Sequence, residues 1–137
     1  GRESDNRIFR EGNNFRKCIA PLQDHSAGGE AVGFIDPESD GSGNCSCGLY
    51  NSKIGIALTL RFNKNQLPCL TNWQHWGKGE YVTGLEPGTN PPTGQAKARD
   101  ENRLIMLQPG ESKQYDLEFE VLDDEKKIRE FLKPYHL

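Results

Sequence analysis

The sequence predicts an antiparallel all-β fold that ends in one short helix. Apolar residues alternate with polar or small ones along several short segments, the pattern of half-buried strands. The chain also holds 15 glycines and 8 prolines in 137 residues, which indicates many turns rather than a helical bundle. Helical spacing of apolar residues occurs near the C-terminus, in 123–134. Periodicity alone leaves sandwich, jelly roll and barrel open.

The first half of the chain changes character near residue 30. Residues 1–29 are polar and aperiodic, so we expect an irregular surface segment. Strands are predicted at 31–35 and 44–50, separated by a turn rich in Asp, Pro and Gly. The clearest strand is 54–62, where large apolar residues occupy every second position.

The second half continues the same pattern. Strands are predicted at 66–73, 80–85, 103–107 and 115–121, the last with an acidic outer face. Residues 87–102 contain three prolines and two glycines, which predicts an extended loop. A helix follows in 123–134, capped by Asp123 or Asp124, with an apolar stripe of Ile128, Phe131 and Leu132. The whole chain, 1–137, is expected to be one domain or part of one, with strands within 30–122.

Composition excludes two classes of partner. The net charge is -3 without a basic run, so no nucleic acid is expected. No apolar stretch approaches the ~20 residues of a membrane helix, so no membrane is expected either. The chain begins with Gly1 rather than Met, and we expect that part of the natural N-terminus is missing.

The four cysteines are Cys18, Cys45, Cys47 and Cys69. We expect free, small apolar residues in a reducing compartment, the cytoplasm, because Cys45 and Cys47 lie too close for an easy mutual disulfide. The alternative is a zinc site of Cys45 and Cys47 with Cys18 or His25. The preferred interpretation includes no metal and no cofactor.

Glu86 is the candidate catalytic residue. It lies at or next to the end of a strand, because Pro87 cannot donate to a β-ladder and pairing there must stop or run along an edge. Gly88 then permits a change of direction. A carboxylate fixed at such a corner could act as a general base. From these residues alone, an ordinary turn carboxylate is the preferred interpretation.

Aromatic residues gather just before Glu86. Trp73, Trp76 and Tyr81 lie within nine positions, next to His75. Aromatic rings stack on the apolar faces of sugars while polar neighbours bind hydroxyls, so these four are candidate substrate-binding residues. An equally favoured interpretation places one tryptophan in the core and the other over a loop.

The remaining histidines are less informative. His25 is a site residue or a surface residue, and His136 lies at the chain end, where ordered structure is least expected. The sequence has no Ser/His/Asp or Cys/His arrangement with recognised spacing and no phosphate-binding loop.

Three motifs in order resemble the C-terminal signature of aldose 1-epimerase (galactose mutarotase-like) proteins, of a poorly characterised branch. They are LPCLTNW at 67–73, GEYVTGLEP at 79–87 and LQPGE at 107–111. The resemblance covers 54–122 well and 1–53 more loosely. It implies a large antiparallel β-sandwich, the supersandwich, that binds a monosaccharide or related sugar. It also implies that Glu86 is the general base and that a histidine protonates the ring oxygen, which favours a site role for Glu86.

Departures from the family qualify this expectation. Its members are much longer, and none of His25, His75 or His136 falls on the motifs of the site histidines. Since a positioned acid or base contributes ~10²–10⁴-fold, we expect this chain alone not to be a competent mutarotase. Half a sandwich leaves edges and an apolar face uncovered, so we expect it to pair with itself or with an N-terminal fragment. The alternatives are a non-catalytic carbohydrate-binding module and a protein-interaction module.

Overall fold

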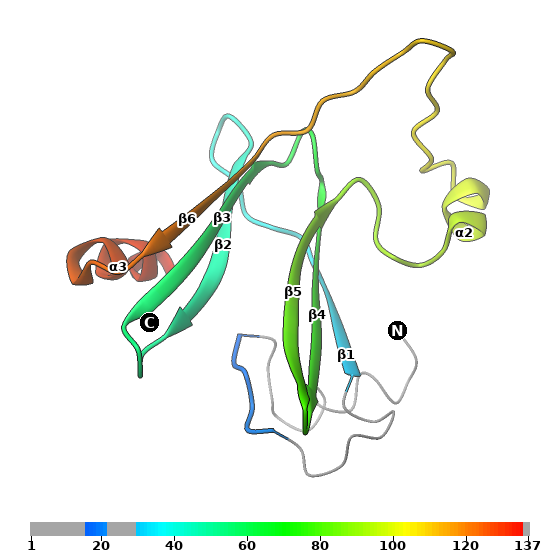
Figure 1. The fold of residues 1–137 in the computed structure, drawn as a ribbon. Helices are drawn as coiled ribbons and strands as arrows, with labels where there is room; N and C mark the ends of the chain where they lie inside the picture. Colours follow the sequence, from blue (N-terminus) through cyan, green and yellow to red (C-terminus); the bar gives the residue numbers. More distant parts are fainter. Residues whose placement is uncertain (1–15, 22–29, 136–137) are drawn as a thin grey trace. The chain divides into compact units, whose positions relative to one another are not determined.

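The computed structural model describes residues 16–21 and 30–135. The chain divides into two compact units, Gly1–Pro37 with Leu67–Ser112 and Glu38–Gln66 with Lys113–Leu137. Each unit is built on a three-stranded antiparallel sheet (Figure 1). The predicted all-β antiparallel fold class is confirmed, together with its short C-terminal helix.

The sheet of the first unit has the order β1-β4-β5. Its strands are β1 (Glu30–Ile35), β4 (Cys69–Gly77) and β5 (Glu80–Gly88). β4 and β5 form a hairpin in which Gly77 pairs with Glu80, so Lys78 and Gly79 make the turn. Gly79 has φ 87°, a conformation that favours glycine. β5 lies at the edge of this sheet (Figure 1).

One face of this sheet carries most of its buried side chains. It carries the apolar residues Ala31, Leu70 and Trp76. Two amides are buried among them: Gln74 Nε2 donates to Asn72 Oδ1 (2.6 Å), and Asn72 Nδ2 donates to Thr83 Oγ1 (3.1 Å) and to the Gly84 carbonyl (3.2 Å). These bonds offset the cost of burying the amides.

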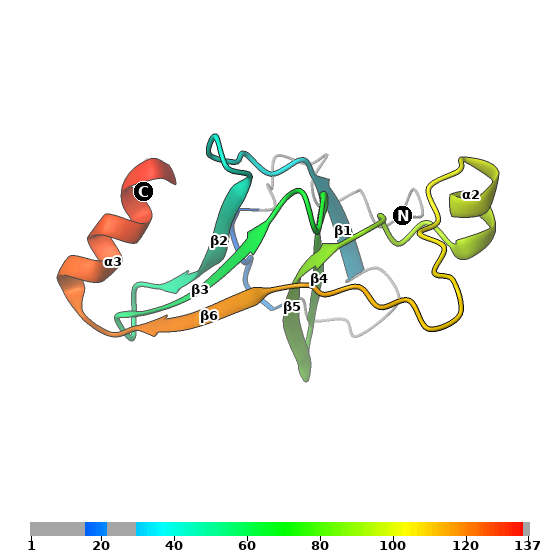
Figure 2. The same cartoon turned by 90° about the horizontal axis from the view of Figure 1, so that it is seen from above.

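The sheet of the second unit has the order β2-β3-β6. Its strands are β2 (Asn44–Asn51), β3 (Ile56–Asn63) and β6 (Leu117–Leu122). The chain reverses after β6, and helix α3 (Glu125–Leu132) packs beside this sheet, followed by the short helix η2 (Lys133–Tyr135) (Figure 2). Ala57, Leu122, Ile128 and Leu132 form the core between helix and sheet.

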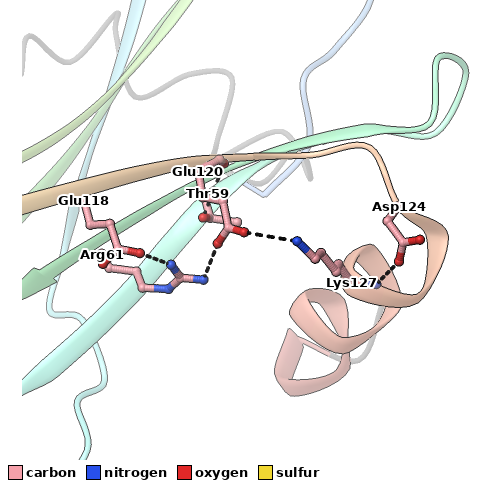
Figure 3. A network of polar contacts seen from close by, with 6 residues as sticks. All are labelled: Thr59, Arg61, Glu118, Glu120, Asp124 and Lys127. Atoms are coloured by element: carbon pink, nitrogen blue, oxygen red, sulfur yellow. Dashed lines mark hydrogen bonds and ion pairs between the residues drawn. The ribbon is translucent and has the colours of Figure 1, made fainter.

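Charged residues extend along the helix-bearing face of the second sheet (Figure 3). The Arg61 guanidinium bridges Glu118 and Glu120, two same-face positions of β6. Lys127 reaches Glu120 (3.8 Å), and Asp124 caps α3 by accepting from the Lys127 amide (3.0 Å). Because these groups are exposed, each pair adds little stability.

The other face of the second sheet is apolar and partly uncovered. Leu60 and Phe62 on β3 are buried, whereas Phe119 and Val121 on β6 are 64% and 65% exposed. Such a run of exposed apolar residues on an edge strand is a feature of surfaces that contact another element or chain.

The structure differs from the predicted elements in three places. The expected loop 87–102 contains a helix, α2 (Gln95–Asp100), because QAKARD is rich in strong helix formers. The strand predicted at 103–107 does not form: this segment is irregular, and Arg103 instead binds back to the loop before it. The strand predicted at 66–73 is shifted to β4, because the apolar pattern continues through Trp76.

Candidate functional site

The β4–β5 hairpin carries all five predicted site residues, but they lie on two faces. Antiparallel partners point to the same side of a sheet, and Trp73 pairs with Gly84, His75 with Val82, and Thr71 with Glu86. Trp73, His75 and Glu86 therefore share the face opposite the buried amides. Trp76 pairs with Tyr81, and both belong to the buried side. We call the face with Glu86 the Glu86 face.

Glu86 lies within the edge strand β5. Pairing continues beyond it to Pro87 and Gly88. Of the two possibilities predicted for Pro87, that pairing stops there or runs along an edge, the structure shows the second. The Glu86 side chain is exposed, and its carboxylate has no hydrogen-bond or ion-pair partner among residues 16–21 and 30–135. Its Oε1 lies over Gly84, 2.6 Å from where a Cβ of that residue would be. The carboxylate is thus free to contact a ligand.

Trp73 lies directly across from Gly84 and diagonal to Glu86. Diagonal neighbours in a sheet lie about 7–8 Å apart, within reach of large side chains. The indole is half-buried, and its ring centroid lies 6.5 Å from that of His75 at a 40° tilt. The Glu86 face therefore combines an accessible aromatic ring with an accessible carboxylate.

His75 stands at the turn end of the hairpin. Its Nδ1 lies 2.9 Å from the Glu80 carbonyl oxygen, and its Nε2 lies 4.0 Å from the Glu80 carboxylate. His75 lies four residues along β4 from Thr71, and Thr71 is the residue that pairs with Glu86. At about 3.3 Å per residue this is roughly 13 Å along the strand. The backbone positions of His75 and Glu86 are thus far apart on the hairpin, and the His75 ring lies against Glu80 at the turn end.

Trp76 and Tyr81 lie on the face that carries the buried amides, where Trp76 is buried and Tyr81 is 47% exposed. Trp76 is 1% exposed and packs with Ala31 and Ile19, and its ring centroid lies 4.7 Å from that of Tyr81. The Tyr81 hydroxyl donates to the Ile19 carbonyl (2.6 Å), and burial, with a contribution from Cys18, raises the pKa of Tyr81. This placement favours the alternative of one tryptophan in the core over direct sugar contact by Trp76. The binding role of Tyr81 stays a prediction.

Arg103 organises the loop that follows Glu86. Its guanidinium donates to Asn90 and Thr93 and pairs with Glu101 (2.6 Å), while the Asn90 amide donates to the Arg103 carbonyl (3.0 Å). Asn102, two positions after α2, has φ 54°, a conformation that asparagine tolerates. Arg103 carries no local signal in the sequence, because Thr93 and Asn90 lie 10 and 13 positions away from it.

The cysteines are free: Cys18 is exposed, Cys45 is buried, and Cys47 and Cys69 are intermediate. Burial raises the pKa of the Cys47 thiol to about 11, with a further contribution from Cys45. Within the described ranges, no three His, Cys, Asp or Glu residues group as metal ligands do. His25 and His136 lie outside the described residues.

A shallow depression of the second unit holds none of the five predicted residues. Its charged lining includes Arg61, Asp116 and Glu118. Arg61 pairs with Glu118, and Asp116 accepts from the Gln66 and Gln114 amides. These groups satisfy one another, so the Glu86 face remains the stronger candidate. In the part of the chain that the structure describes, no helix is long and apolar enough to cross a membrane.

Comparison with known proteins gives two matches. The family model "Domain of unknown function (DUF4432)" matches residues 2–121. A crystal structure from Klebsiella pneumoniae subsp. pneumoniae MGH 78578, of a protein described as a "putative aldose 1-epimerase", is similar with a TM-score of 0.81 and 26% sequence identity. The similarity covers 97% of this chain and 34% of that chain. No curated protein matches.

These matches confirm the resemblance to the aldose 1-epimerase superfamily that the three sequence motifs predict. The fold is an aldose epimerase-like one, mostly β with two antiparallel sheets and few short helices. This chain spans about a third of the length of the Klebsiella protein.

Proposed function

The chain belongs to the family of the domain of unknown function DUF4432, and we propose that it forms part of a carbohydrate-binding isomerase that interconverts the anomers of an aldose. The similarity to the Klebsiella protein supports the general kind of activity. The observation that carries the proposal is the Glu86 face, where an exposed carboxylate, without a partner among the described residues, lies diagonal to the half-buried Trp73 indole.

In the proposed reaction, the apolar side of the sugar ring stacks on Trp73 and Glu86 acts as the general base. Glu86 takes the proton of the anomeric hydroxyl, and an acid gives a proton to the ring oxygen as the bond between that oxygen and C1 breaks. Rotation about C1–C2 presents the other face of the carbonyl. The ring oxygen then attacks C1, and the two protons return to the groups that supplied them.

The acid in this scheme comes from outside the β4–β5 hairpin. The backbone position of His75 lies roughly 13 Å along the strand from that of Glu86, whereas both protons move at atoms bonded to one carbon. We therefore propose that the rest of the longer protein supplies the acid, and that this chain by itself does not catalyse mutarotation. Mutarotation by the isolated chain above the buffer rate, followed by polarimetry, would contradict this.

The function is tested with Glu86→Gln in the full-length protein. The variant keeps the shape of the side chain but removes its basicity, so turnover is expected to fall by about 10²–10⁴-fold while sugar affinity changes little. Exchange between anomers is measured by NMR, and affinity by calorimetry across a panel of aldoses. Unchanged turnover in Glu86→Gln would rule out Glu86 as the base.

A non-catalytic carbohydrate-binding module is the second candidate. It is favoured by the absence, on the described part of the Glu86 face, of an acid within reach of Glu86. This module would bind sugar through Trp73 yet leave the anomer ratio of the sugar to relax at the buffer rate, even in the full-length protein. If sugars fail to bind at millimolar concentration, a role in protein contact gains support.

A further inference from the structure

We propose that Gly84 is a positioning residue for Glu86, present because a side chain there would displace the Glu86 carboxylate from the surface of β5. The inference rests on the proposed function and adds a residue to it. It concerns a glycine that the turn chemistry of the hairpin does not require.

The backbone does not explain this glycine. Gly79, in the turn, has φ 87°, a conformation in which other residues are strained. Gly84 lies in the middle of β5 and is not among the residues with positive φ. A glycine at such a position weakens a strand, since it has no side chain to pack and loses more entropy on folding.

The surroundings of Gly84 explain it. A Cβ at this position would lie 2.6 Å from Glu86 Oε1, 3.3 Å from its Cδ and 3.4 Å from its Cγ. Nothing from the backbone is among these contacts. Since the atoms belong to the end of a flexible side chain, an added methyl group would move the carboxylate and leave the strand in place.

Gly48 in β2 provides a contrast. A Cβ there would lie 2.3 Å from the Leu58 carbonyl oxygen and 2.8 Å from the Phe131 ring. This glycine permits close packing between backbone, sheet and helix, so its replacement should disturb the fold. Gly84 and Gly48 are both strand glycines, but only at Gly84 is the obstructing group the candidate base.

The position of Trp73 links the contact between Glu86 and Gly84 to the proposed sugar site. Trp73 faces Gly84 across the ladder, so the carboxylate that lies over Gly84 is placed against the cross-strand neighbour of the indole. A sugar stacked on Trp73 would then present its hydroxyls to Glu86. A displacement of about 1 Å in such a group can cost 10²-fold in rate.

The test compares Gly84→Ala, Glu86→Gln and the double variant in the full-length protein. For Gly84→Ala we expect kcat to fall about 10–10²-fold with KM nearly unchanged, and the melting temperature to stay the same or rise. In the double variant, Gly84→Ala should add nothing to the loss caused by Glu86→Gln, because both act through one carboxylate. Gly41→Ala is the matched control, since a Cβ at Gly41 meets nothing within 4 Å.

The outcomes separate the two proposals. If Glu86→Gln is fully active, the proposed function fails whatever Gly84→Ala does. If Glu86→Gln is inactive and Gly84→Ala retains wild-type kcat, the positioning role is wrong. Multiplicative losses in the double variant, or a Gly84→Ala protein that fails to fold or melts as early as Gly48→Ala, would assign Gly84 to the sheet instead.

Discussion

Trp73 and Trp76 lie three positions apart on β4 and point to opposite faces of its sheet, one half-buried on the Glu86 face and the other 1% exposed. The two indoles therefore have different neighbours. Trp76 contacts the small core of the first unit, whereas Trp73 lies across from a glycine. Substitution at the two positions should have separable effects.

Replacement of Trp76 by Ala should destabilise the first unit. Removing a large buried aromatic side chain costs about 3–5 kcal/mol, and the Tyr81 ring would lose its partner. The measurement is urea denaturation followed by circular dichroism, with Trp76→Phe as the milder control. A Trp76→Ala midpoint equal to that of the wild type would show that the residue is not part of a core.

Replacement of Trp73 by Ala should weaken sugar binding with a smaller effect on folding. The loss of one stacking surface is expected to reduce affinity by about fivefold to tenfold, corresponding to roughly 1–1.4 kcal/mol. Calorimetric titration of the full-length protein gives the affinity, and Trp73→Phe should retain most of it. An affinity equal to that of the wild type would remove Trp73 from the proposed site.

Replacement of Arg103 by Ala should loosen the loop 89–102. The substitution removes charge-assisted hydrogen bonds to Asn90, Thr93 and Glu101, each worth about 1.5–3 kcal/mol when well shielded and less here, because the side chain is partly exposed. Hydrogen exchange should become faster at the amides of α2. Arg99→Ala, at an exposed position of that helix, is the control; equal exchange rates in the two variants would contradict the predicted role.

Acid should weaken the turn before β2. The Asn44 and Ser42 amides donate to Asp40, and hydrogen bonds from Asn44, then Ser42, lower the pKa of Asp40. A carboxyl whose pKa is lower in the folded state stabilises it above the unfolded pKa, about 3.9. That stability is lost as the pH falls from there through the folded pKa. Asp40→Asn should flatten this part of the stability profile measured between pH 5 and 2; an unchanged profile would exclude Asp40 as its source.

Self-association, or association with an N-terminal fragment, remains our expectation for this chain. The exposed apolar residues Phe119 and Val121 supply a surface for it, and burial of such residues contributes about 25 cal/mol per Å². Light scattering should detect the assembly, and Phe119→Lys with Val121→Lys should weaken it, whereas Glu130→Lys on α3 should not. A stable monomer without a partner would contradict the expectation.

Much of the fold follows from local sequence patterns. Ile56, Leu58, Leu60 and Phe62 alternate so regularly that β3 could be assigned from them, and the Asp124 cap and the Ile128 stripe define α3. The predicted elements were wrong where the sequence pattern was short or where tertiary contacts determined the local structure. Helix α2 spans six residues within a proline-rich loop, and the strand predicted at 103–107 was displaced by the contacts of Arg103.

The candidate site was predictable in its members but not in its geometry. Motifs brought out Glu86 and its aromatic neighbours. Alternation within β4 separates Trp73 from Trp76 by face, but only the pairing of β4 with β5 puts Trp73 on the face of Glu86 and sets His75 four positions from the partner of Glu86. These relations depend on strand register, which is set by the turn and by both strands together rather than by either strand alone. The contact of Glu86 with Gly84 is a property of side-chain conformation and left no signal in the sequence.

The buried amide of Asn72 stabilises the register of the β4–β5 hairpin. It donates both to the Thr83 hydroxyl and to the Gly84 carbonyl on the neighbouring strand, in the register in which Trp73 faces Gly84. A slip of one residue would break both bonds and turn Glu86 toward the side occupied by Trp76. The placement of the candidate base thus depends in part on Asn72, a side chain buried on the opposite face of the sheet.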